Sequence, residues 1–291
     1  MVIHHFTYGP VTPALAYVMS CTGSLLGLLC TSRAITFSGR SRARWLAFGA
    51  FAIGGTGVWG MHFIAMLGFT VGGATIRYDI PLTLLSAVIS VAVVGIGLFV
   101  VDVGEIKPYA LIIGGAITGV GVAAMHYTGM AAMHMNTTLR YDRHTVTASV
   151  LIAIAAAIAA LWAAFRVRGN WATAGAALIM GVAVSSMHYT GMAALSVRGV
   201  ASADSLPGAE PMQFLVPLIV GISLSTICLA IAVGTAPTAR EIQARTELLD
   251  RIARRREGPW NGAAGTGAAG TGGRPVHGDP PGWRQPPGPR P

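Results

Sequence analysis

The chain has 291 residues, of which 53% are hydrophobic and 11% are charged, and its mean hydropathy is +0.60. A soluble domain carries about 25% charged residues, so this composition excludes a water-soluble globular protein and indicates a membrane protein. The formal net charge is +9, and we expect its partner to be anionic membrane lipid, with no nucleic acid bound.

Apolar runs of the length that crosses a bilayer, about 20 residues, occur along most of the chain. In order, the seven runs lie near residues 11–32, 45–69, 80–101, 110–133, 146–165, 172–195 and 213–234. They are too long and too uniformly apolar for the alternating strands of a membrane barrel. We therefore predict an all-α membrane protein with seven transmembrane helices over residues 1–235.

The segment after the last apolar run differs in composition. Residues 236–257 are basic, and from residue 238 they predict a short amphipathic cytoplasmic helix that contacts the inner leaflet or a partner. Residues 258–291 are rich in Gly and Pro and predict a disordered tail. We expect no output enzyme in these last residues, so the signalling partner would be a separate cytoplasmic protein.

Basic residues predict the orientation, because cytoplasmic loops retain Lys and Arg. One side of the predicted topology carries Arg33, Arg40, Arg42, Arg44, Lys107, Arg166, Arg168 and the basic tail, and the other carries Arg77, Arg140, Arg143 and Arg198. We predict a multi-pass protein of the cell membrane, with the amino terminus outside and the carboxyl terminus in the cytoplasm.

One short motif recurs inside the apolar runs. Met-His-Tyr-Thr-Gly-Met occurs at 125–130 and 187–192, and a looser copy, Met-His-Phe-Ile-Ala-Met, at 61–66. A histidine in hydrocarbon is costly and indicates a functional site. Each histidine shares a helix face with the methionine four residues later: His62 with Met66, His126 with Met130, and His188 with Met192. The proximal Met61, Met125 and Met187 point about 100° away from that face.

The motif belongs to an internal repeat, because its histidines are 64 and then 62 residues apart. Such a period holds two helices, with the motif on the second helix of each pair after a glycine-rich stretch. Arg-Tyr-Asp follows the first copy at 77–79 and the second at 140–142, but the third copy lacks it. We predict three helix pairs plus a seventh helix, with all three motifs at one depth near the outer face.

Imidazole and thioether groups together favour a soft cation, copper and especially Cu(I). Zinc is less favoured because no thiolate or carboxylate lies within the motifs. Three histidines and three distal methionines exceed the four ligands that one ion needs, so one site uses a subset or there are several sites.

Purely structural roles of the motif residues are an alternative to metal binding. Methionine fills gaps in cores, a buried histidine often hydrogen-bonds to a neighbouring helix, and Tyr127 and Tyr189 suit a membrane interface. Duplication of the repeat would also copy one packing solution three times.

Other seven-helix functions fit less well. A retinal protein needs a lysine in its seventh helix, and the only lysine, Lys107, lies in a predicted loop. Two histidines on facing helices would suit a haem, which stays an alternative cofactor. A copper or small-solute transporter needs ligands along its whole path, whereas these cluster at one depth. No catalytic constellation or nucleotide-binding motif is visible, so we predict a non-enzymatic sensor.

The repeated Met-His-Tyr-Thr, the Arg-Tyr-Asp echo and the paired-helix period resemble the MHYT domain family of bacterial membrane sensors over about residues 10–235. The resemblance implies an integral membrane sensory domain that binds copper near the outer face and thereby senses oxygen, carbon monoxide or nitric oxide. Many such members carry a fused output domain. The implied copper-binding residues are Met61, His62, Met125, His126, Tyr127, Met187, His188 and Tyr189. In the first copy Phe63 replaces the tyrosine and removes a phenol.

Overall fold

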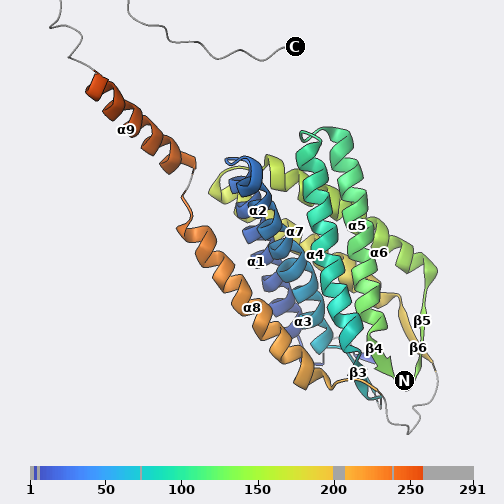
Figure 1. Ribbon diagram of the computed structural model, residues 1–291. Helices are drawn as coiled ribbons and strands as arrows, with labels where there is room; N and C mark the ends of the chain where they lie inside the picture. The colour runs from blue at the N-terminus through green and yellow to red at the C-terminus, as the bar shows by residue number, and fades with distance from the viewer. Residues whose placement is uncertain (1–2, 5–6, 73, 199–206, 238, 258–291) are drawn as a thin grey trace, which may run out of the picture. The chain divides into compact units, whose positions relative to one another are not determined.

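The protein is described by a computed structural model that covers residues 3–4, 7–72, 74–198, 207–237 and 239–257. The chain divides into two units, Met1–Ala239 and Arg240–Pro291. Within the described residues, seven helices are long and apolar enough to cross a membrane, which confirms the predicted class (Figure 1). They are α1 (Val11–Ala34), a continuous helix made of α2 (Gly39–Ala50), η1 (Phe51–Gly60) and α3 (Met61–Leu67), α4 (Ile80–Val103), α5 (Pro108–Ala131), α6 (Arg143–Arg166), α7 (Asn170–Ala193) and α8 (Pro211–Thr235).

The first six transmembrane helices form a closed ring. Each packs on the next in chain order, and α7 returns to α1. Helix α8 lies outside the ring against α1, η1 and α3 (Figure 1). The three motif copies lie in α3, α5 and α7, which are alternate members of the ring. The ring therefore gives each motif an equivalent place in the bundle.

The stretch before the first motif, η1, is a π-helix rather than an α-helix. Its glycines permit very close packing: Ser90 of α4 donates a hydrogen bond from Oγ to the carbonyl of Gly54 over 2.7 Å. On the other side, a side chain at Gly23 of α1 would collide with the backbone of Gly57. The small glycine residues of this stretch therefore let the helix backbones approach closely. The π geometry was not predicted, because it leaves no periodic signature in so apolar a sequence.

Replacing Gly54 by valine is expected to destabilise the bundle. A Cβ at this position would lie 2.7 Å from the carbonyl oxygen of Ser90 and 3.0 Å from the Cα of Val91, and these backbone atoms cannot move aside singly. Overpacking of this kind costs about 1–3 kcal/mol, so the thermal midpoint of the detergent-solubilised protein should fall. The control is Gly221→Val on α8, where nothing lies within 4 Å. Equal midpoints for the two variants would contradict the proposed packing.

The end of the ring that carries the motifs is closed by short strands that the sequence did not predict. Among the described residues, β1 (Ile3–His4) pairs with β2 (Thr70–Val71), β3 (Ile76–Tyr78) with β4 (Met133–Met135), and β5 (Thr138–Tyr141) with β6 (Leu195–Arg198), all antiparallel. Each pair joins the segment before one ring helix to the segment after a motif helix. Strands of two to four residues are too short to show a pattern in the sequence.

These strand pairs extend the threefold repeat and explain the Arg-Tyr-Asp echo. Asp79 and Asp142 cap α4 and α6, accepting hydrogen bonds of 2.8 Å from the backbone N–H groups of Leu82 and Thr145. The hydroxyl and amide of Thr145 hold the pKa of Asp142 below its ordinary value. The echo therefore opens the second and third helix pairs rather than closing the first and second.

Equivalent backbone hydrogen bonds occur once in each helix pair. They join Thr7 to Gly68 (3.0 Å), Asp79 to Ala132 (2.8 Å) and Asp142 to Ala194 (2.9 Å), so in this bond Thr7 takes the place of the aspartate in the first pair.

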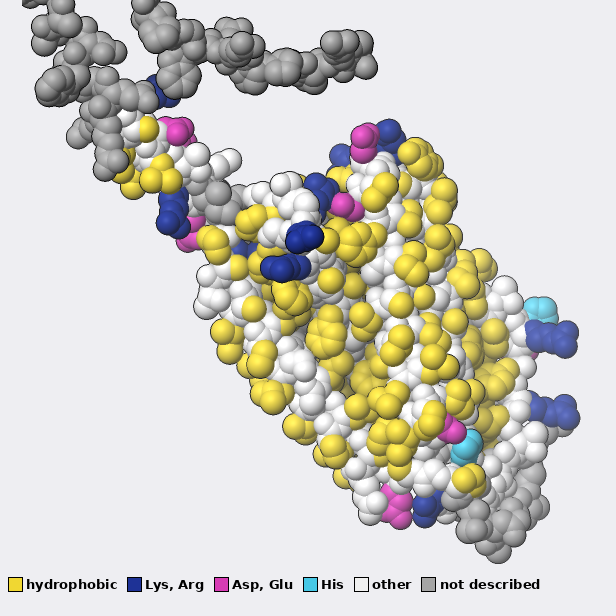
Figure 2. Space-filling view, viewed as in Figure 1, with side chains coloured by type: hydrophobic (Ala, Val, Ile, Leu, Met, Phe, Trp, Pro, Cys, Tyr) yellow, Lys and Arg dark blue, Asp and Glu magenta, His cyan; other side chains and the backbone are white. Residues whose placement is uncertain are grey.

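Ionic contacts gather at the opposite end of the ring. Arg42 of α2 makes a bidentate ion pair with Asp102 of α4. Arg33 at the end of α1 donates hydrogen bonds to the carbonyls of Ala236 and Pro237, just after α8, and lies over the ring of Trp45. Between the two ends, hydrophobic side chains cover the visible face of the bundle (Figure 2). This surface agrees with a membrane-spanning bundle, whereas the predicted orientation of the termini stays a prediction.

The second unit contains helix α9 (Ala239–Glu257). The predicted helix over 238–257 is therefore present, and its Leu248, Leu249 and Ile252 side chains are exposed. The side chains of Ile242 and of residues 255–257 lie outside the described part, as does the predicted disordered tail over 258–291.

Candidate metal centre

The three motif histidines converge on one point in the middle of the ring. His62 of α3, His126 of α5 and His188 of α7 are all buried, with no more than 1% of each residue exposed. Their Nδ1 atoms are 3.1 Å apart for His62 and His188, 3.2 Å for His126 and His62, and 3.4 Å for His188 and His126. Each pair of rings meets edge to face, with centroids 5.0–5.1 Å apart. We call these three side chains the histidine cluster.

Protons alone cannot satisfy this cluster. In a neutral imidazole each ring nitrogen either carries a hydrogen or presents a lone pair. With three Nδ1 atoms facing one another, at least two must be alike, so two lone pairs or two N–H groups oppose each other in every arrangement. A cation between the three nitrogens would instead attract all three lone pairs. The geometry therefore fits a metal ion better than a hydrogen-bond network.

The spacing also has the size of a metal site. An equilateral triangle with sides of the mean Nδ1–Nδ1 separation has its corners about 1.9 Å from its centre, close to the ~2.0–2.1 Å between zinc and an imidazole nitrogen. Within the described part of the chain, the only group of three or more His, Cys, Asp or Glu side chains that could hold a metal is this one. It contains no carboxylate or thiolate.

An aromatic ring braces each imidazole. The residue after each histidine packs edge-on against it, with centroid separations of 4.7 Å for Phe63, 4.9 Å for Tyr127 and 4.9 Å for Tyr189. Phenylalanine performs this role as well as tyrosine does. The replacement of tyrosine by Phe63 in the first copy therefore leaves the brace intact.

A glycine of the next copy makes room for the outer edge of two imidazoles. A Cβ on Gly129 would lie 2.6 Å from Nε2 of His62, and a Cβ on Gly191 would collide with Nε2 of His126. Within the described residues, neither Nε2 has a hydrogen-bond partner. Metal-bound histidines usually donate this second nitrogen to an acceptor. Here tight packing, rather than a hydrogen bond, orients these two rings.

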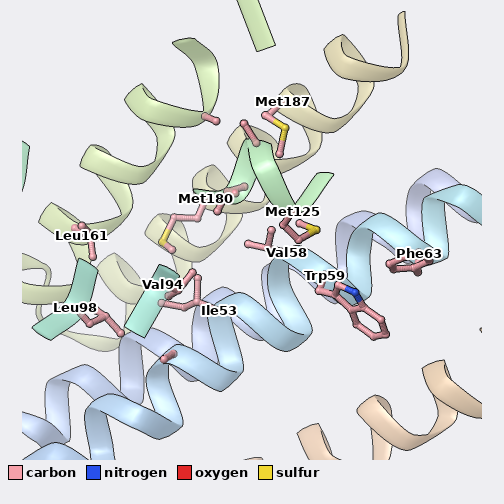
Figure 3. Close-up of a cluster of buried hydrophobic side chains, with 14 of the residues drawn as sticks. Ile53, Val58, Trp59, Phe63, Val94, Leu98, Met125, Leu161, Met180 and Met187 are labelled. Carbon is pink, nitrogen blue, oxygen red and sulfur yellow. The ribbon is translucent and has the colours of Figure 1, made fainter. Parts of the chain in front are cut away.

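The motif methionines are buried in the hydrophobic core. The proximal Met125 and Met187 belong to a large apolar cluster with Val58, Trp59 and Phe63 (Figure 3). Met61 packs in a second cluster with Ile64 and Ala65, and Met66, Met130 and Met192 are members of the large cluster. The structure thus brings together His62, His126 and His188 as nitrogen donors and places the motif methionines in the hydrophobic core. Sulfur ligation stays a prediction.

The hydroxyl of Tyr127 has a structural partner. It lies 2.7 Å from Oγ of Ser149 on α6. Replacing Tyr127 by phenylalanine should remove this bond, worth about 1 kcal/mol, and leave copper binding within about twofold of wild type, because the ring still braces His126. The measurements are the thermal midpoint and a copper titration. Loss of copper binding in this variant would show that the phenol itself is a ligand.

The sequence did not reveal Gly129, Gly191 or Ser149 as part of the site. The glycines are letters of the repeated motif itself, so the repetition of glycine three residues after His126 and His188 was an available signal. Ser149 carries no such signal, because its role depends on how α6 packs on α5.

The arrangement can be compared with known proteins. The sequence model named MHYT, described as "Bacterial signalling protein N terminal repeat", matches residues 55–115, 119–177 and 181–244. The chain belongs to the MHYT family. Each match begins in a motif helix and continues into the following helix, so the family repeat includes one histidine of the cluster per copy.

Related MHYT proteins are signalling proteins. The chain is 37% identical to the bifunctional diguanylate cyclase/cyclic di-GMP phosphodiesterase MucR of Pseudomonas aeruginosa, over 84% of this chain and 36% of MucR. It is 35% identical to the cyclic di-GMP phosphodiesterase NbdA of the same organism, over 73% of this chain and 27% of NbdA. It is 29% identical to the signaling protein YkoW of Bacillus subtilis, over 65% of this chain and 24% of YkoW. The chain thus spans about a third or less of these relatives, and no solved structure matches it.

Proposed function

We propose that this MHYT protein is a membrane sensor that holds one copper ion, as Cu(I), between His62, His126 and His188. The observation that carries the proposal is the convergence of three buried Nδ1 atoms within 3.4 Å of one another. Because the cluster offers a single centre, we propose one ion for the three motifs rather than one ion for each.

The charge of the site favours Cu(I) over a divalent ion. The cluster contains three neutral imidazoles and no acidic side chain, so the ion would keep its full charge in a buried place. The cost of moving an ion out of water rises with the square of its charge in the Born treatment, so a monovalent ion costs about a quarter as much as a divalent one. Imidazole also suits copper chemically.

The same spacing argues against the alternative of a haem. A bis-histidine haem places the porphyrin plane between its two axial nitrogens, and Nδ1 atoms 3.1–3.4 Å apart leave no room for that plane. Transport finds little support either, because the one group of described His, Cys, Asp or Glu side chains that could hold a metal lies at a single place rather than along a path.

Sensing would use the open coordination of such a site. Copper bound by three imidazoles supplies a further position at which oxygen, carbon monoxide or nitric oxide can bind. The protein contributes the rigid triangle of donors, the aromatic braces and the apolar surroundings that exclude water. The six motif methionines are buried in the hydrophobic core, and we propose them as supplementary soft donors.

A route for the signal runs from the cluster to α8. Helix η1 precedes His62 directly, and its Thr56 shares a buried hydrogen bond of 2.8 Å with Thr226 of α8. Arg33 then holds the carbonyls after α8. We propose that movement of η1 reaches a separate cytoplasmic signalling protein through this route. Because MucR and NbdA are named for cyclic di-GMP turnover, that partner is proposed to act on cyclic di-GMP, while this chain itself is non-enzymatic.

Metal analysis of the full chain in detergent tests the proposal. After loading with Cu(I) under reducing conditions and removal of unbound metal, we expect one copper per chain, no displacement by equimolar zinc, and no Soret band from protein made in haem-replete cells. Less than a tenth of a copper per chain, or stoichiometric haem, would overturn the proposal. Sustained copper uptake into proteoliposomes would instead identify a transporter.

A further inference from the structure

An apolar cavity lies inside the ring, immediately beside the histidine cluster. It has a volume of about 50 Å³ and is lined by residues of η1, α4, α5, α6 and α7. Figure 3 labels six of the residues that line it: Ile53, Val58, Val94, Leu161, Met180 and Met187. The three imidazoles, the aromatic rings that brace them and the motif glycines do not line this cavity.

A triad of valines separates the cavity from the histidines. Val58, Val122 and Val184 all line the cavity, and each stands four residues before a histidine of the cluster. Residues four apart lie one above the other on a helix. The valine triad therefore repeats the symmetry of the histidine triad one turn away, on the side opposite the strands.

The lining excludes water. Thr118 is the only polar residue among the lining residues, and its hydroxyl is 3.2 Å from the carbonyl of Val93, to which it donates. A buried water needs about two to four polar partners, and apolar cavities without them stay dry. A cavity needs about 10–15 Å³ of probe volume to hold one water, so about 50 Å³ has room for a few heavy atoms. The space therefore suits an uncharged molecule of two or three heavy atoms.

Part of the cavity wall reaches the outer surface of the bundle. Four alanines of α6 line it, and two of them, Ala156 and Ala160, are only half-buried, as is Ala183 of α7. These small side chains are what separates the cavity from the hydrocarbon between α6 and α7. Apolar gases are more concentrated in hydrocarbon than in water, so this side of the cavity faces the higher concentration of gas.

The neighbouring repeat carries larger residues at the equivalent positions. Asp79 and Asp142 cap α4 and α6 at equivalent positions, so residues 63 apart correspond. Ala156 and Ala157 of α6 thus stand where α4 has Val93 and Val94. The same fold accepts the larger residue in one repeat and the smaller one in the other, so valine is the natural substitution for filling the cavity at α6.

We propose that this cavity docks an uncharged diatomic molecule that enters from the lipid between α6 and α7 and is held beneath the histidine cluster. This proposal rests on the proposed function, because the molecule would bind first in the cavity and then at the metal. The docking itself needs no metal, since the lining is complete without one.

Xenon is the probe for the cavity, since apolar cavities bind it. We would record ¹²⁹Xe NMR spectra of the metal-free full chain in detergent as xenon pressure is raised, and compare wild type with an Ala156→Val/Ala157→Val variant that copies α4. The control, Ala155→Val/Ala159→Val, adds the same methyl groups on the exposed side of α6. We expect the pressure-dependent shift to fall at least fivefold in the filled variant and to persist in the control.

A xenon shift that is equal in the filled variant and wild type, or that is absent from wild type because an acyl chain fills the cavity, would overturn the proposal. Copper stoichiometry measured on the same three proteins separates the two claims. Equal copper with lost xenon binding supports the cavity and the metal site together. No copper in any of the three proteins, with xenon bound by wild type and the control but not by the filled variant, rejects the metal site and supports the cavity.

Discussion

Replacing His126 by alanine is expected to lower the affinity for Cu(I) by at least about 100-fold, more than loss of an outer-shell partner costs. The variant removes one corner of the triangle and leaves His62 and His188 with a single Nδ1–Nδ1 contact of 3.1 Å. Two imidazoles can share one proton between them, so the remaining pair no longer needs a cation. Competition against a copper(I) chelator measures the affinity.

The control for this experiment is His144→Ala, since His144 is exposed and lies outside the cluster. A second readout is stability: a ligand present at 100 times its Kd raises the free energy of unfolding by about 2.7 kcal/mol, so copper should raise the thermal midpoint of wild type and of His144→Ala, but not of His126→Ala. Equal copper affinity in the two variants would exclude His126 as a ligand.

The second large effect is expected from Gly191→Ala, although this change touches no donor atom. The added Cβ would collide with Nε2 of His126 and lie 2.9 Å from its Cδ2, so the ring must turn and Nδ1 leaves the triangle. Loss of a group that orients a metal-bound histidine costs about 10–100-fold in affinity. The same titration measures it.

The matched control is Gly175→Ala on the same helix, where nothing lies within 4 Å of the added atom. The first motif already carries an alanine, Ala65, at the position of Gly129 and Gly191. By the symmetry of the repeat, Ala65 would face the third imidazole, so Ala65→Gly should leave copper affinity within about twofold. If Gly191→Ala and Gly175→Ala bind copper alike, packing on the glycine does not orient His126.

Much of the fold could be predicted because membrane helices can be recognised in a sequence by their length and hydropathy. The seven predicted spans overlap the seven helices of the structure, and the histidine period placed the motifs on alternate helices. The closure of α1 through α7 into a ring could not be predicted, because hydropathy says which segments cross the membrane and not which helices are neighbours. The π-helix η1 and the short strand pairs depend on tertiary contacts and leave no periodic signal.

The candidate site was predicted in its residue types but not in its geometry. Helical spacing placed each histidine with the methionine four residues later, on one face, and so gave equal weight to imidazole and thioether. The structure brings the three Nδ1 atoms together and buries the methionines in the surrounding core. Spacing along one helix cannot decide which of its residues meet across three helices.

X-ray absorption at the copper edge, on the Cu(I)-loaded full chain, tests the central claim most directly. The account predicts one copper per chain with about three nitrogen neighbours at about 2.0 Å, together with the outer-shell scattering that imidazole rings produce. This signal should disappear in a His62→Ala/His126→Ala/His188→Ala variant. A first shell of sulfur alone at about 2.3 Å, without imidazole scattering, would contradict the account and assign the metal to the methionines.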